Sequence, residues 1–141
     1  SRIRALSQEN EGLTKSLNGL LKEARGKLIA RADANAQTIW DFCDERDWIA
    51  NLAQDPATRS NTSVCLKFTD PRINDGAAFA KAVAKRLEAE GVALDIGAYR
   101  DAPAGLRIWC GGTVETADVA AMLPWLDWAF HAEIEAQAAA A

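Results

Sequence analysis

The chain has 141 residues, a formal net charge of −4 and a single histidine. Its length suits one domain with a sizeable core, and its acidic balance argues against non-specific nucleic-acid binding, which requires a basic face. It contains no run of about 18 apolar residues and no signal-peptide pattern at its start, so we expect no membrane span. Because it opens on Ser rather than Met, we expect a processed or excised piece.

A helix is predicted over residues 13–42, where apolar side chains recur at steps of one, three or four. Glycine costs about 1 kcal/mol relative to alanine inside a helix, so Gly19 and Gly26 leave open whether this is one long helix or two. The stretch that follows, around Pro56, predicts irregular structure.

A strand, a helix and a second strand are predicted in the middle of the chain. SVCLKFT (63–69) alternates its side chains as a half-buried strand does and ends at an Asp-Pro pair. A helix over residues 77–90 follows, with Asp75 as its N-cap and Gly91 in the left-handed position that ends many helices. The alternation in VALDIGA (92–98) predicts another strand.

LRIWC (106–110) predicts a third strand, and a last helix follows it. The alternation turns Arg107 to the face opposite the apolar side chains. Thr116 can cap the last helix, in which Pro124 should cause a kink or a restart. The alanine-rich tail after Ile134 is expected to fray.

The predicted order is therefore helix, strand, helix, strand, strand, helix. Runs of this kind form a small antiparallel sheet with helices packed on one face. We predict an α+β two-layer sandwich that forms a single domain over residues 13–141, preceded by a loose polar arm over residues 1–12. No internal repeat and no low-complexity linker indicates a second domain.

The three cysteines, Cys43, Cys65 and Cys110, are scattered and form no CxxC pair. With only one histidine the chain cannot build a Cys/His zinc cage, so we expect no metal site. Cys65 and Cys110 fall in strand-like runs, where a buried thiol packs as a small hydrophobe. Free thiols of this kind indicate a reducing compartment, and we expect the cytoplasm.

Motifs for catalysis are lacking. No HExxH, GxxxxGK[ST] or GxGxxG sequence is present, and no acidic pair stands out as an acid–base couple. His131 falls late on the last predicted helix, where a solvated surface position is the better interpretation. We therefore expect no catalytic residue in this chain.

Two arginines, Arg100 and Arg107, flank the loop DAPAG (101–105). An arginine on the outer face of a strand either points to solvent or meets an anion, and its fork of donors matches a carboxylate in two parallel hydrogen bonds. Arg100 could bind a second anionic group of the same ligand. The pattern alone also allows Arg107 to pair with an internal Asp or to extend into solvent.

Three stretches of the sequence closely resemble the C-terminal small domain of phosphoserine aminotransferases. They are IARADANA (29–36), DPATRSNTSVCLKFTDP (55–71) and LEAEGVALDIGAYRDAPAGLRIWCGGTVETADVAAMLPWLDWAF (87–130). The combination of GLRIWCG with LPWLDWAF is far more specific than a short motif. Arg59 also matches an arginine of the family, and we assign it no role. Residues 1–27 match poorly.

The resemblance implies a fold-type-I enzyme that uses pyridoxal phosphate to transfer an amino group between glutamate and 3-phosphohydroxypyruvate, a step of serine biosynthesis. It implies that Arg107 binds the α-carboxylate of the substrate and Arg100 its phosphate, with Tyr99 in place of the family's usual histidine. It implies two partners, the cofactor-binding large domain of the same enzyme and a second copy in a homodimer. The Schiff-base lysine belongs to that large domain, so we expect this chain alone to bind no cofactor and to be inactive.

Two other classes of function stay open. The chain could be a stand-alone regulatory module that binds an anionic metabolite, as other small helix-backed sheets do. It could also be an interaction or scaffold domain without ligand chemistry. The leucines within residues 1–27 could pack on a partner, and five tryptophans leave room for an exposed aromatic patch.

Overall fold

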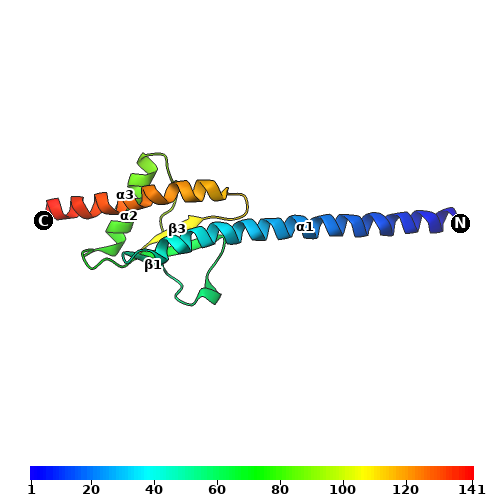
Figure 1. Cartoon of the computed structure of the whole chain (residues 1–141), viewed down its shortest axis with the longest axis horizontal. Helices are drawn as coiled ribbons and strands as arrows, with labels where there is room; N and C mark the ends of the chain where they lie inside the picture. Colours follow the sequence, from blue (N-terminus) through cyan, green and yellow to red (C-terminus); the bar gives the residue numbers. More distant parts are fainter.

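A computed structural model describes all 141 residues, and its first element, α1, is one helix from Arg2 to Asp44 (Figure 1). The Ser1 side chain accepts a hydrogen bond from the Arg4 backbone N–H and caps the helix. The prediction of a loose arm over residues 1–12 is therefore wrong. Arg, Leu, Ala, Gln and Glu dominate that segment, and their high helix propensity outweighs its weak apolar periodicity.

The two parts of α1 lie in different surroundings. Residues 1–30 are exposed throughout, and the helix carries this part away from the rest of the molecule (Figure 1). From Arg31 onward one side of α1 is buried against the domain. The exposed part carries eight large apolar side chains, which we call the leucine stripe: Ile3, Leu6, Leu13, Leu17, Leu20, Leu21, Leu28 and Ile29.

Three antiparallel strands form one sheet in the order β1-β2-β3. They are β1 (Ile49–Asn51), β2 (Ser63–Phe68) and β3 (Leu106–Trp109), and Cys65 of β2 pairs with Arg107 of β3. The predicted strands at 63–69 and 106–110 are thus confirmed to within a residue. A 3-10 turn, η1 (Pro56–Thr58), separates β1 from β2.

The segment 92–98 was predicted as a strand, and the structure corrects this. Only Gly97 makes a bridge, to Leu106, and the rest is irregular. Asp95 adopts φ of 53°, in the left-handed region, and so breaks the extended run. In its place β1 completes the sheet, within a stretch expected to be irregular.

Helix α2 (Gly76–Ala89) follows the sequence prediction closely. The Asp75 side chain accepts a hydrogen bond from the Ala78 backbone N–H at 3.0 Å, which confirms the predicted N-cap. Gly91 has φ of 68°, as the left-handed end of a helix requires. The apolar face of α2 buries Phe79, Val83 and Leu87.

Helix α3 runs from Thr116 to Ala140 and passes through Pro124 without a break. Its N-cap residue is Glu115, so the predicted cap at Thr116 is wrong. The Thr116 hydroxyl instead donates to Oδ1 of the buried Asn35 at 2.6 Å. The predicted fraying after Ile134 is also not seen, because alanine is the strongest helix former and extends the helix.

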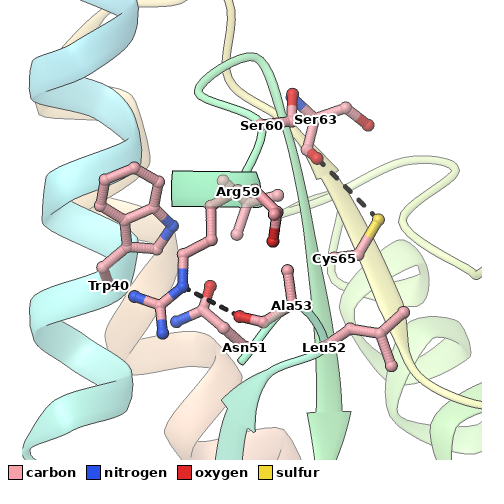
Figure 2. A pocket seen from close by; sticks show the side chains of 10 residues that line it. Trp40, Asn51, Leu52, Ala53, Arg59, Ser60, Ser63 and Cys65 are labelled. Atoms are coloured by element: carbon pink, nitrogen blue, oxygen red, sulfur yellow. Dashed lines mark hydrogen bonds between the residues drawn. The ribbon is translucent and has the colours of Figure 1, made fainter. Parts of the chain in front are cut away.

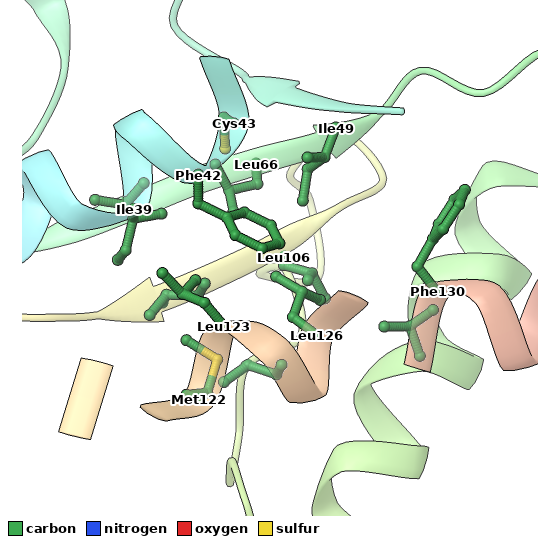
Figure 3. Close-up of a cluster of buried hydrophobic side chains, with 14 of the residues drawn as sticks. Ile39, Phe42, Cys43, Ile49, Leu66, Leu106, Met122, Leu123, Leu126 and Phe130 are labelled. Carbon is green, nitrogen blue, oxygen red and sulfur yellow. The ribbon is translucent and has the colours of Figure 1, made fainter. Parts of the chain in front are cut away.

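The helices cover one face of the sheet, as expected for an α+β two-layer sandwich. Ile39 and Phe42 of α1 meet side chains of the sheet and of α3 (Figure 3). The alternate strand positions, which carry Cys65, Lys67 and Arg107, lie on the opposite face, which we call the outer face. No helix of the chain is both long enough and apolar enough to span a bilayer.

Two of the three free thiols belong to the interior. Burial raises the pKa of Cys43 to about 12, and the neighbouring Asp44 charge contributes in the same direction. Burial also raises the pKa of Cys110. Cys110 therefore packs as a small hydrophobe, as predicted, whereas Cys65 is half-buried on the outer face.

Candidate functional site

Arg107 projects from β3 on the outer face, and its side chain is only 15% exposed. Its backbone N–H donates to the Ile96 carbonyl at 2.8 Å, which ties β3 to the loop before it. The guanidinium carbon lies 4.2 Å from the centre of the Tyr99 ring, within the range of a cation–π contact. The Nε atom is buried and has no hydrogen-bond partner in the chain.

One carboxylate approaches this guanidinium. Nη2 of Arg107 lies 3.5 Å from Oδ2 of Asp95, a distance at the outer limit of a hydrogen bond. The Asp95 side chain is 93% exposed, so water competes for its charge and the pair is a weak one. Arg107 therefore has an internal partner, but one that an incoming carboxylate could replace.

Open space adjoins Arg107 on two sides. A cavity of about 330 Å³ is lined by Arg107 and Asp95 together with Leu94 and Trp109. A smaller one, of about 20 Å³, lies between Arg107 and Tyr99 and holds no more than a water-sized group. The first cavity has room for a small amino acid beside the guanidinium.

Arg100 is exposed and has no carboxylate within 4.0 Å. It lines a pocket of about 510 Å³ together with Tyr99 and with Lys81 of α2. Tyr99 also lines the small cavity beside Arg107, so the two arginines lie at adjoining pockets. No pattern in the sequence places Lys81 here, because its position beside the loop depends on how α2 packs.

The chain does not offer a site for pyridoxal phosphate. This cofactor needs a lysine for its Schiff base and a carboxylate for its pyridine nitrogen. Five of the six lysines are exposed, and Lys67 is half-buried on the outer face without an ion-pair partner. The one lysine–carboxylate pair, Lys27 with Glu23, lies on the exposed part of α1. The residues present therefore do not fit the cofactor.

His131 is exposed on α3, 4.0 Å from Asp127 one turn earlier, as predicted for a surface histidine. No group of three or more His, Cys, Asp or Glu side chains is arranged to hold a metal ion.

No protein-family model matches the chain. It is 43% identical over 106 residues to a phosphoserine aminotransferase from Methanosarcina barkeri and 42% identical over 106 residues to one from Methanosarcina mazei. Each match covers 74% of this chain and 27% of the relative.

The fold and this similarity place the matched part of the chain among the aminotransferases, as a small α+β domain. The family is that of the phosphoserine aminotransferases, and the extent of the match agrees with a C-terminal fragment of such an enzyme. The chain spans 27% of the length of these curated relatives.

Proposed function

We propose that the chain is the small domain of a phosphoserine aminotransferase and that it supplies the substrate-binding arginines of that enzyme. The relatives are named for this activity, and Arg107 offers the observation that carries the proposal. Its guanidinium is oriented by Tyr99, borders a cavity and is paired only with an exposed carboxylate at 3.5 Å. Such a group is ready to exchange that partner for a substrate carboxylate.

Arg107 has the features of a carboxylate clamp. Its guanidinium carbon lies 4.2 Å from the centre of the Tyr99 ring, and Arg107 also lines the larger cavity. A guanidinium can bind a carboxylate through two parallel hydrogen bonds. The low exposure of Arg107 strengthens such a bond, because little water competes for the charge. We infer that the α-carboxylate of glutamate or phosphoserine binds here.

Arg100 has the features of a phosphate contact. It has no carboxylate partner, and Lys81 adds a second cation to the same pocket. A phosphate group carries more charge than a carboxylate and is well served by two cations. Contacts at both ends of one small molecule would fix its central carbon, which is how positioning residues lower a reaction barrier.

The cofactor would be bound by a large domain, in the part of the enzyme that lies outside the 27% of the relatives' length matched here. We propose that pyridoxal phosphate binds there and that this chain alone has no transaminase activity. The enzyme would then also depend on domain closure to bring the arginines to the cofactor, and the family's homodimer would be its assembled form.

The test has two arms. The chain alone, given pyridoxal phosphate, glutamate and 3-phosphohydroxypyruvate, should turn over no faster than the free cofactor. A chimaera in which these 106 residues replace their counterpart in the Methanosarcina barkeri enzyme should form phosphoserine. Turnover by the chain alone, or a folded chimaera without activity, would contradict the proposal. Calorimetric binding of phosphoserine to the chain alone would instead support a metabolite-binding module.

A second role, as an interaction element, is favoured by the leucine stripe. Five residues of this stripe, together with Asn10 and Ala24, form a seam along α1 in which successive positions are alternately three and four residues apart. The seam consists of Ile3, Leu6, Asn10, Leu13, Leu17, Leu20 and Ala24. This is the spacing of a coiled-coil seam, and a single asparagine inside such a seam sets the register of parallel dimers. The seam is about 32 Å long at 1.5 Å per residue, and no other element of the chain covers it.

We propose that a second copy of the chain pairs in parallel along this seam, so that the two Asn10 side chains meet. Light scattering after gel filtration should then give twice the monomer mass for the chain and one monomer mass for Leu17→Glu. Gln8→Glu, on the opposite side of α1, is the matched control and should stay dimeric. A monomeric parent chain would refute this pairing.

A further inference from the structure

Arg59 is the exception among the half-buried arginines. Each of the others lies within 4.0 Å of a carboxylate: Arg31, Arg46, Arg86 and Arg107. Arg59 has no carboxylate at that distance, and its only hydrogen bond runs from Nε to the Ala53 carbonyl at 3.0 Å. The two terminal nitrogens of its guanidinium have no partner in the chain. Solvent reaches these nitrogens, so they can meet an anion that enters from outside.

A second unpartnered donor lies beside it. The Nε1 atom of Trp40 is buried and has no hydrogen-bond partner, one of two such side-chain atoms in the molecule. The guanidinium carbon of Arg59 lies 5.7 Å from the Trp40 ring centre. Asn51, only 7% exposed, also lines this space, and its side chain makes no hydrogen bond within the chain. Buried polar groups normally have partners, so the buried Trp40 N–H indicates a missing one, and the solvent-reached polar atoms of Arg59 and Asn51 lie beside it.

These side chains surround a cavity of about 290 Å³ (Figure 2). Trp40 comes from α1, Asn51 ends β1, and Arg59 follows η1, so three elements build the site. The η1 turn is fixed by Asp55, whose carboxylate accepts a hydrogen bond from the Ala57 backbone N–H at 2.9 Å. Leu52 and Val64 add apolar wall.

We propose that this cavity is a binding site for a small monocarboxylate, separate from the pocket of Arg107. The guanidinium fork would bind the carboxylate oxygens, and the indole N–H of Trp40 would donate a further hydrogen bond to one of them. One guanidinium balances one negative charge, which favours a carboxylate over a phosphate dianion. The indole and the apolar walls suit a short hydrocarbon chain on the acid. A bound water would serve Trp40 but would leave the charge of Arg59 unpaired.

The site is independent of the proposed transaminase role. Leu52 and Cys65 border both this cavity and the small one beside Arg107, so the two sites are neighbours without sharing an arginine. Variants of Arg59 and of Arg107 therefore separate the two proposals.

The test follows the Trp40 indole N–H signal in NMR spectra of the ¹⁵N-labelled chain, assigned by its loss in Trp40→Phe. Sodium propionate should shift this signal saturably, and sodium chloride at equal ionic strength should not. Arg59→Gln should weaken binding at least about tenfold, as expected for hydrogen bonds to a charged group. Arg107→Gln and Arg72→Gln, an exposed arginine paired with Asp70, should leave the titration unchanged.

Two results would overturn the inference: an indole signal that does not respond to propionate, and a response that Arg59→Gln leaves intact. Circular dichroism shows whether Arg59→Gln folds. If it does not, Arg59→Lys keeps the charge but loses the fork, and unchanged propionate binding by that variant refutes the site. Inorganic phosphate that binds more tightly than propionate would refute the assignment to a monocarboxylate.

Discussion

Asn35 offers the sharpest prediction about stability, because it is fully buried and joins α1 to the segment between β3 and α3. Its Nδ2 atom lies within hydrogen-bond distance of the carbonyls of Cys110, Gly111 and Val114, at 2.9, 3.2 and 2.9 Å. Its Oδ1 accepts from Thr116 at 2.6 Å. Asn35→Ala removes all of these contacts and leaves buried carbonyls without a donor.

The size of the effect follows from counting hydrogens. An asparagine amide donates two hydrogens, so Asn35 makes the equivalent of three hydrogen bonds, each worth about 1 kcal/mol net. Alanine regains up to about 0.7 kcal/mol as the better helix former. The free energy of unfolding should therefore fall by about 2–3 kcal/mol.

Urea unfolding followed by circular dichroism, at one fixed protein concentration, measures this change. The slope with urea should stay the same and the midpoint should fall. Asn18→Ala, on the exposed part of α1, is the matched control and should cause no loss of stability. A loss below about 1 kcal/mol in Asn35→Ala would refute the reasoning, since even one unsatisfied buried carbonyl costs that much.

Other outcomes follow from the same contacts. In the chimaera, Arg107→Met should lower kcat/KM by about 30-fold to 1,000-fold. This corresponds to about 2–4 kcal/mol, the cost of truncating one partner of a charge pair. Arg72→Met is the control and should leave kcat/KM unchanged. Asp95→Ala should leave substrate affinity equal or higher, because it removes the competing carboxylate; a clear loss would show that Asp95 helps to bind substrate. In the folded chain, a disulfide exchange reagent should modify Cys65 first, and fast reaction of Cys43 would contradict its burial. The pKa of Cys43 rises from 9.0 to about 12 on folding, so its thiol stabilises the fold below pH 9. That contribution should be lost as the pH rises from 9 towards 12, and the urea midpoint should fall. In Cys43→Ala the urea midpoint should fall less over this pH range.

Local signals were sufficient for part of the fold. Asp75 and Gly91 bracket α2 because a side-chain cap and a left-handed end act within a few residues. The alternation in residues 63–69 and 106–110 reports the two faces of the sheet directly. By contrast, β1 has three residues and is extended because it pairs with β2, which is a non-local cause. Thr116 fails as a cap because its hydroxyl is taken by Asn35, 81 residues away.

The candidate sites divide in the same way. The outward position of Arg107 follows from strand alternation. Its contacts with Tyr99 and Asp95 depend on the irregular segment before β3, which alternation wrongly predicted to be a strand. The cavity at Arg59 combines residues of α1, β1 and the η1 turn, and no spacing in the sequence joins them. A half-buried arginine without an acid becomes visible only once the packing is known.

The continuity of α1 has a mechanical consequence. No proline interrupts the helix, and its buried half holds Asn35, which binds the backbone directly after β3. A rotation of α1 at its exposed end would thus be transmitted to β3, which carries Arg107, because no hinge lies between them. Gly12, Gly19 and Gly26 are the most flexible positions along the way. A partner bound to the exposed end of α1 would therefore influence the position of the Arg107 guanidinium from several helical turns away.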